Sequence, residues 1–192
     1  MPDYFVQAAW QASDRPALIY QTLNWNMNRH LGVNAVIPFR IGKWLDSRLT
    51  LTGMHMRQRC DQFHDLSFDR TKWVAVASLE NTFHLSSKPD LSLEINGSFQ
   101  SKAIQGTFDI DPLGSVDAAI KWTFAGKRAS LSVRCGDIFE TSSPYTRIRY
   151  RGQWLDMGSS HYTRTTTINF SYRFGGYKER KHKEVDTSRF GH

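Results

Sequence analysis

Hydrophobic and polar residues alternate along most of this chain. The alternation is clearest between Thr163 and Phe174, where apolar residues occupy even positions and polar residues occupy odd ones. The even set is Ile168, Phe170, Tyr172 and Phe174, and the odd set is Thr165, Thr167, Asn169, Ser171 and Arg173. A period of two residues is typical of a β-strand whose faces meet different surroundings. The segment therefore predicts a strand with one apolar and one polar face.

The same pattern recurs upstream and predicts an all-β fold, an antiparallel up-and-down meander of about eight strands. The strands are expected within residues 17–25, 31–39, 48–61, 73–85, 91–99, 116–124, 131–151 (with a kink after Gly136) and 163–174. Short turns are expected near Lys43, Lys88 and Lys127, and longer polar loops at 62–70, 101–114 and 152–162. Helix caps before a 3.6-residue repeat are almost absent.

The pattern divides the chain into three parts. Residues 1–16 form an N-terminal segment with a short strand at 4–9, and residues 17–174 carry the predicted barrel strands. Residues 175–192 are polar and mixed in charge, which predicts a tail without fixed structure. The N-terminus has no basic and apolar leader pattern, so the chain is expected to be cytosolic or a piece of a longer protein.

The composition excludes a membrane-spanning helix but leaves both a soluble domain and a membrane β-barrel open. The chain has 192 residues, of which 40% are hydrophobic, enough for one sizeable domain. No run of 18 apolar residues occurs, which excludes a membrane-spanning helix but not a spanning β-barrel. The net charge is +7, yet Lys and Arg are scattered along the strands, so nucleic-acid binding is not expected.

Residue types that carry chemistry do not form a convincing site. His55, His64 and Asp65 lack the spacing of a metal site, and Asp109, Asp111 and Asp65 match no calcium loop. No nucleophile elbow is present. Cys60 and Cys135 are not expected to form a disulfide, because Cys135 has the parity of the apolar face and Cys60 lies near a strand end. We therefore predict no catalytic residue, cofactor or metal.

The central question is which face of the strands points inward. A soluble sandwich or calycin-like barrel buries the apolar set, whereas a membrane barrel turns it towards lipid and lines its lumen with polar residues. Aromatic residues cluster at strand ends, as interfacial girdles require, and the polar face carries charges of both signs. The predicted lumen-lining residues are Glu80, Glu94, Asp117, Lys121, Arg134, Arg147, Arg149 and Arg173. Arg147, Arg149 and Arg151 share one face and form a second candidate, a site for an anionic sugar or lipopolysaccharide. Pattern alone leaves the two kinds of barrel about equal.

Three segments add a resemblance to a known family. They are Thr167–Gly176, Val116–Phe124 and the element Gly136-Asp137-Ile138-Phe139, with a similar ending at Val185–Gly191. Together they resemble the C-terminal barrel of TonB-dependent receptor-like outer-membrane proteins, specifically the outer membrane protein β-barrel family. In the third element Gly136 stands where the family has Asn, and Glu140 where it has Asp.

The resemblance implies a bacterial outer-membrane barrel that imports scarce nutrients such as metal chelates or glycans, with no enzymatic activity. In such receptors an N-terminal plug, absent here, fills the barrel, and an inner-membrane complex energises transport. The chain would form the final third of a barrel of about 22 strands. Its implied partners are outer-membrane lipid and the barrel-assembly machinery, which would recognise Phe170, Tyr172 and Phe174. The 18 residues after Phe174 depart from the usual pattern, in which an aromatic residue ends the chain. The resemblance does not identify the cargo.

Three hypotheses follow from these observations. The chain is a fragment of a receptor-type transport barrel, a small eight-stranded outer-membrane protein, or a soluble calycin-like ligand-binding barrel. Detergent dependence and heat-modifiable gel mobility would separate the first two from the third. A plug-coding region in frame upstream of Met1 would separate the first from the second.

Overall fold

The protein consists of β-strands joined by turns and loops. The computed structural model describes residues 4–63, 66–150, 153–158 and 162–174. The strands are β1 (Tyr4–Gln11), β2 (Leu18–Trp25), β3 (Met27–Ile41), β4 (Leu45–Phe63), β5 (Leu66–Ser87), β6 (Asp90–Gln100), β7 (Ala103–Gln105), β8 (Phe108–Ile110), β9 (Leu113–Phe124), β10 (Ala129–Gly136), β11 (Tyr145–Tyr150), β12 (Gln153–Gly158) and β13 (Thr165–Tyr172). The described residues include no helix with the length and hydropathy of a membrane span.

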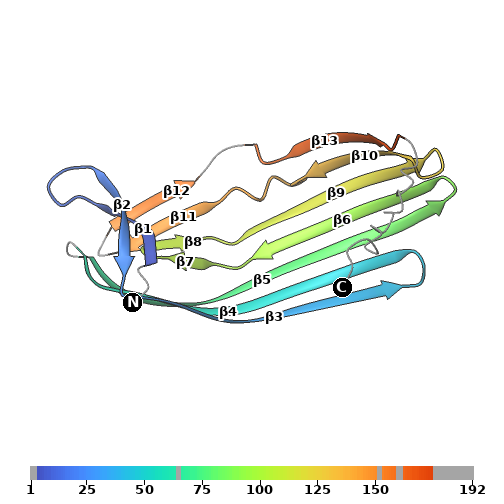
Figure 1. The fold of residues 1–192 in the computed structure, drawn as a ribbon. Helices are drawn as coiled ribbons and strands as arrows, with labels where there is room; N and C mark the ends of the chain where they lie inside the picture. Colours follow the sequence, from blue (N-terminus) through green and yellow to red (C-terminus); the bar gives the residue numbers. More distant parts are fainter. Residues whose placement is uncertain (1–3, 64–65, 151–152, 159–161, 175–192) are drawn as a thin grey trace, which may run out of the picture.

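Seven of these strands form one antiparallel sheet, which we call the membrane sheet after the prediction that its strands span the outer membrane. Its order is β13-β10-β9-β6-β5-β4-β3. The sheet is strongly curved and forms a trough whose two edges, β13 and β3, do not meet (Figure 1). The fold is therefore the predicted antiparallel all-β architecture, with the barrel left open.

A second group of strands lies beyond one end of the trough, and we call it the distal tier. It contains a four-stranded sheet of order β12-β11-β8-β7 and the hairpin β1-β2. Figure 1 shows β7, β8 and β11 continuing the lines of β6, β9 and β10 after short breaks, while β4 and β5 run through without a break. The membrane sheet therefore ends in connections of two kinds, short turns at one end and this folded tier at the other.

Strand register keeps the apolar residues of the membrane sheet on one face. Leu93 on β6 lies opposite Ile120 on β9, which in turn lies opposite Val133 on β10. Val133 lies opposite Ile168 on the edge strand β13. A slip of one residue in any of these pairings would move an apolar row to the polar face. The alternation predicted from the sequence is thus confirmed as a continuous surface across the seven strands.

The turns at the other end of the trough are short, as predicted. They connect β3 to β4 at residues 42–44, β5 to β6 at residues 88–89 and β9 to β10 at residues 125–128. Gly42 adopts a φ of 56° and Gly126 a φ of 66°, a region where residues with a Cβ are strained. Such turns join neighbouring antiparallel strands directly.

The hydrophobic core lies mainly in the distal tier. Ile148 on β11 is 1% exposed and packs with Ala9 and Phe108, and the partly buried Leu155 and Met157 lie against this cluster. Thr107 joins the four-stranded sheet of the tier to the hairpin, because its hydroxyl donates a hydrogen bond of 3.0 Å to the carbonyl oxygen of Ala9. A second contact joins Trp25 at the end of β2 to Phe68 on β5, with ring centroids 5.4 Å apart.

Several predicted boundaries were wrong. The membrane sheet has seven strands rather than eight, because the segment predicted at 17–25 pairs with β1 instead of β3. The predicted loop at 62–70 falls largely within β4 and β5, that at 101–114 contains β7, β8 and the start of β9, and that at 152–162 contains β12. The prediction treated these segments as loops because they are rich in charged residues. In the structure those charges pair across strands. In addition, β7 and β8 are too short to show a two-residue period. The tail predicted at 175–192 lies outside the described residues.

Candidate functional site

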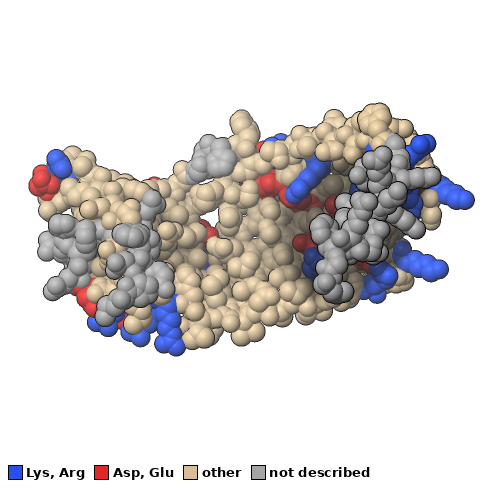
Figure 2. Space-filling model, viewed as in Figure 1, with Lys and Arg blue, Asp and Glu red and all other residues tan. Residues whose placement is uncertain are grey.

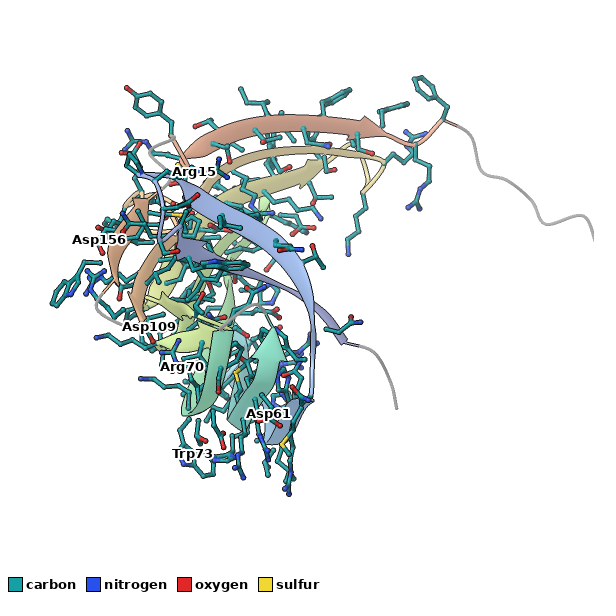
Figure 3. All side chains as sticks on the ribbon, turned by 90° about the vertical axis from the view of Figure 1, so that its left-hand side faces the viewer. Arg15, Asp61, Arg70, Trp73, Asp109 and Asp156 are labelled. Atoms are coloured by element: carbon teal, nitrogen blue, oxygen red, sulfur yellow. The ribbon has the colours of Figure 1, made fainter. Side chains whose placement is uncertain are left out.

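The convex face of the trough is apolar and exposed. Val33 is 77% exposed, Trp73 73%, Ile168 71% and Phe170 63%. Trp73 points away from the trough on this side (Figure 3), and the register places the other three residues on the same face. A contiguous apolar surface of this extent is unusual for a soluble monomer and marks contact with a partner or with lipid. A soluble barrel would enclose these side chains, so the calycin-like hypothesis does not fit.

Aromatic residues border this apolar face at both ends. Near the short turns, Trp44 stacks on Phe83 with ring centroids 6.1 Å apart. The pairs Trp122 with Phe124 and Tyr172 with Phe174 lie at the same end. Near the distal tier the border is formed by Trp73 and Phe99, which are 73% and 50% exposed. On β5 the segment from Trp73 to Phe83 is 11 residues long, the length of a tilted strand that crosses a bilayer.

The convex face becomes charged immediately beyond Trp73. Arg57 donates two hydrogen bonds to Asp69, of 3.0 and 2.7 Å, and Arg59 pairs with Asp61 at 2.5 Å. The Arg57 guanidinium lowers the pKa of Asp69 by these hydrogen bonds and its charge. An abrupt change from apolar to ionic residues along one face is expected where a strand leaves hydrocarbon for water.

Two polar residues interrupt the apolar face near the short turns. Ser47 is 7% exposed and donates a hydrogen bond of 2.8 Å to the Asn81 side-chain oxygen. The Asn81 amide donates another bond to the carbonyl oxygen of Ile95. Because each group has a partner, neither leaves an unsatisfied polar atom facing an apolar medium.

The concave face carries the polar set. Five of the predicted lumen-lining residues lie there, namely Glu80, Glu94, Asp117, Lys121 and Arg134. Three of them form ion pairs with residues on neighbouring strands. Arg48 pairs with Glu80 at 3.5 Å, and Arg134 pairs with Asp117 at 2.5 Å. Figure 2 looks onto this open side and shows acidic and basic side chains within the hollow between the two edges.

The remaining predicted lining residues lie elsewhere. Arg147 and Arg149 are on β11, on the face opposite Ile148, whose side chain is buried under the hairpin. They therefore project outward from the distal tier instead of lining the trough. Arg173 follows the end of β13, where its amide donates a hydrogen bond to the Arg128 carbonyl oxygen. Arg151 lies outside the described residues.

A cavity of about 620 Å³ lies on the concave side where the hairpin meets the sheet. Apolar atoms from Met54, Met56 and Val74 line it, and His30 and Gln58 contribute polar groups. Met54 and Met56 break the alternation of β4, because these apolar residues lie on its polar face. The cavity explains this position, since these two side chains lie under β2 and not in open water.

The loop between β10 and β11 is organised around Asp137, which is 5% exposed. Its carboxylate accepts hydrogen bonds from the amides of Thr141 and Ser142, both at 3.0 Å, and from the Ser142 hydroxyl at 2.6 Å. The Thr163 hydroxyl, from the start of the last segment, also donates to it. The Ser142 and Thr163 hydroxyls, with the two amides, hold the pKa of Asp137 well below its usual range. The sequence gives little sign of this role, because the element Gly136-Asp137-Ile138-Phe139 indicates a family resemblance and not the partners of its carboxylate.

The other candidate residues have structural partners. The His55 ring contacts the Trp73 ring at 4.8 Å, while His64 and Asp65 lie outside the described residues. Asp109 pairs with Arg70, and Asp111 pairs with Arg147 at 2.5 Å. Among the described residues, no three potential metal ligands come together. The residues proposed for assembly lie together at the end of the edge strand: Phe170 and Tyr172 on β13, with Phe174 just beyond.

Comparison with known protein families shows which one the chain matches. The profile of a family described as "Outer membrane protein beta-barrel family" matches residues 3–172. No curated protein and no solved structure shows significant similarity to the chain. The matched residues include all but the last two of the described ones.

Proposed function

Because the chain belongs to the outer membrane protein β-barrel family, and so resides in the bacterial outer membrane, we propose that it is the C-terminal part of a TonB-dependent receptor-like barrel. Such a barrel imports a scarce nutrient and is not an enzyme. On this proposal, strands from another part of a longer protein complete the wall and an N-terminal plug fills the lumen. The barrel-assembly machinery recognises the β13 edge through Phe170, Tyr172 and Phe174.

The observation that carries the proposal is the number and direction of strands in the membrane sheet. Successive strands alternate in direction, so the two edges of a seven-stranded antiparallel sheet, β3 and β13, run parallel to each other. Bacterial outer-membrane barrels have an even number of antiparallel strands. If this sheet closed directly, β3 and β13 would pair as parallel strands. The addition of an odd number of strands makes the total even, so that every pair in the closed barrel is antiparallel.

Energetics supports the same proposal. An unpaired edge in hydrocarbon leaves backbone N–H and C=O groups without partners, at a cost of several kcal/mol for each group. β3 extends over 15 residues and pairs only with β4 among the described strands. The polar concave face also suits a water-filled interior through which a polar cargo passes.

Cross-linking tests whether the chain closes on itself. In a background with Cys60→Ala and Cys135→Ala, one cysteine is placed on β3 and one on β13, over several registers, and a short bifunctional maleimide is added to outer membranes. The matched control is Ile120→Cys with Val133→Cys, because these residues lie directly opposite each other on β9 and β10. We expect the control to cross-link within one chain and the β3 and β13 pairs not to do so. A monomeric cross-link between β3 and β13 would show that seven strands suffice and would end the proposal.

Transport is tested separately in cells. A strain that lacks the gene is grown with single scarce nutrients supplied as metal chelates or as glycans. We expect the loss of uptake of one class, restored by the gene and abolished when the proton gradient is dissipated. Uptake that survives loss of the gradient would argue against an energised receptor.

A further inference from the structure

The outward face of the distal tier carries a ladder of Arg and Asp residues. We call it the Arg–Asp ladder. Its members are Asp109, Asp111, Arg147, Arg149 and Asp156 in the tier, together with Arg70, which reaches Asp109 from β5. Arg70 pairs with Asp109, Arg147 with Asp111 and Arg149 with Asp156. Register places Asp109 and Asp156 directly opposite Arg147, on its two sides. Figure 3 shows Arg70, Asp109 and Asp156 along the side of the tier that faces away from the open trough.

Two aromatic rings are stacked on this ladder. The Arg149 guanidinium lies over the Trp154 ring at 4.8 Å from its centroid, and the Arg147 guanidinium lies over the Tyr145 ring at 5.4 Å. Backbone carbonyls also hold Arg149, because it donates to the oxygen atoms of Ile148 at 2.9 Å and Leu155 at 3.1 Å. The guanidinium is therefore fixed before any ligand arrives. Trp154 nevertheless remains 79% exposed.

An exposed indole beside oriented guanidinium and carboxylate groups suits a saccharide. A sugar ring offers an apolar C–H face that packs on an aromatic ring, and its neighbouring hydroxyls accept from Arg and donate to Asp. A phosphate group alone fits less well. The three Asp residues neutralise the three Arg residues, so the ladder has no excess charge to attract an anion.

The position of the ladder favours one source of saccharide. Outer-membrane barrels have their short turns in the periplasm and their long connections outside, which places the distal tier at the cell surface. On the convex face the apolar surface ends at Phe99, which lies opposite Gly114. Asp111 comes three residues before Gly114 in the sequence, which places it about 10 Å beyond the apolar border at roughly 3.4 Å per residue. The outward face at this height meets the sugars attached to the lipid of the outer leaflet.

We propose that Trp154 and the Arg–Asp ladder bind the core saccharide of lipopolysaccharide molecules that surround the barrel. This surface anchors the protein laterally in the outer leaflet and is separate from any cargo path on the concave side. The proposal requires only residence in the outer membrane. It holds whether or not further strands complete the barrel.

The test measures lipid binding to the full chain in detergent by native mass spectrometry. The probes are lipopolysaccharide that carries the core saccharide, lipid A without it, and the free core saccharide. Trp154→Ala removes the stacking surface, and Tyr162→Ala is the matched control, because Tyr162 is 92% exposed and belongs to neither the ladder nor its stacked rings. Arg149→Lys is a second variant that keeps the charge but loses the planar fork, and it decides the question if Trp154→Ala does not fold.

We expect the chain to bind core-bearing lipopolysaccharide about tenfold more tightly than lipid A, the change produced by one good aromatic contact. Trp154→Ala and Arg149→Lys should remove that preference and leave lipid A binding unchanged, while Tyr162→Ala should retain it. Equal preference in all variants would overturn the proposal. Binding of the free saccharide as tight as that of the whole lipid would also overturn it, because the surface would then serve a soluble glycan.

Discussion

A charge placed on the convex face tests which side of the sheet meets lipid. Ile120 lies on β9, an interior strand of the membrane sheet, on the apolar face, and is 44% exposed. The preceding residue, Ala119, lies at almost the same depth on the concave face, opposite Glu94 and Arg134. Ile120→Arg and Ala119→Arg therefore introduce the same side chain on opposite faces of one strand.

The depth of Ile120 sets the expected magnitude. It is four residues from Phe124, which marks the aromatic border near the short turns. With a rise of about 3.4 Å per residue and a tilt of about 40°, this is about 10 Å into an apolar band about 25 Å tall. Arg near the midplane of a barrel's lipid face costs about 2 to 3 kcal/mol, or about 30- to 150-fold in the folding equilibrium. Arg at position 119 lies between Glu94, which attracts it, and Arg134, whose charge is already paired with Asp117, and should cost less than about 1 kcal/mol.

The assay is urea-dependent unfolding of the protein from lipid vesicles, followed by heat-modifiable mobility on gels. We expect a clear loss of stability for Ile120→Arg and a small change for Ala119→Arg. The reverse order, with Ala119→Arg the more damaging, would mean that the apolar face is the interior. The assignment of the two faces would then be wrong.

Three further changes test other parts of the structure. Asp137→Asn should weaken the loop between β10 and β11 and remove part of the pH dependence of stability. Because the folded state lowers the pKa of Asp137, its stabilisation is complete above the unfolded value of about 4 and declines as pH falls below it, which acid titration of both proteins will show. Ile148→Ala should destabilise the distal tier by about 2 to 5 kcal/mol, measured as earlier proteolysis of that tier than of the membrane sheet. In variants that each keep a single Trp, brominated lipids should quench Trp73 strongly and Trp25 little, since Trp25 is 4% exposed and packs on Phe68.

The sequence predicted the membrane sheet better than the distal tier. Each membrane strand has unlike surroundings on its two faces, so a two-residue period runs through residues such as Leu91 to Phe99 and identifies both faces. The three short turns were also predicted correctly near Lys43, Lys88 and Lys127. The alternation and the turns each depend on residues that are close together in the chain, so both can be predicted from the sequence alone.

The distal tier depends on contacts between distant segments. β7 and β8 have three residues each, too few for a period, and their buried residues Ile104 and Phe108 are recognised only once their partners are known. Arg147 and Arg149 follow the alternation of their neighbours, but that alternation does not say that Ile148 is covered by the hairpin. The prediction that these two arginines line the lumen was therefore wrong, and nothing in the neighbouring sequence could have shown it.

The bond between Thr107 and Ala9 joins residues 98 positions apart, and Ile148 completes the same cluster from still further along the chain. No early segment can build that cluster alone. Almost the whole chain, from β1 to β11, must therefore reach the outer membrane before this buried cluster can form. The last strand of the wall, β13, follows β11 in the sequence, so the tier and the β13 edge of the trough both wait for the final part of the chain.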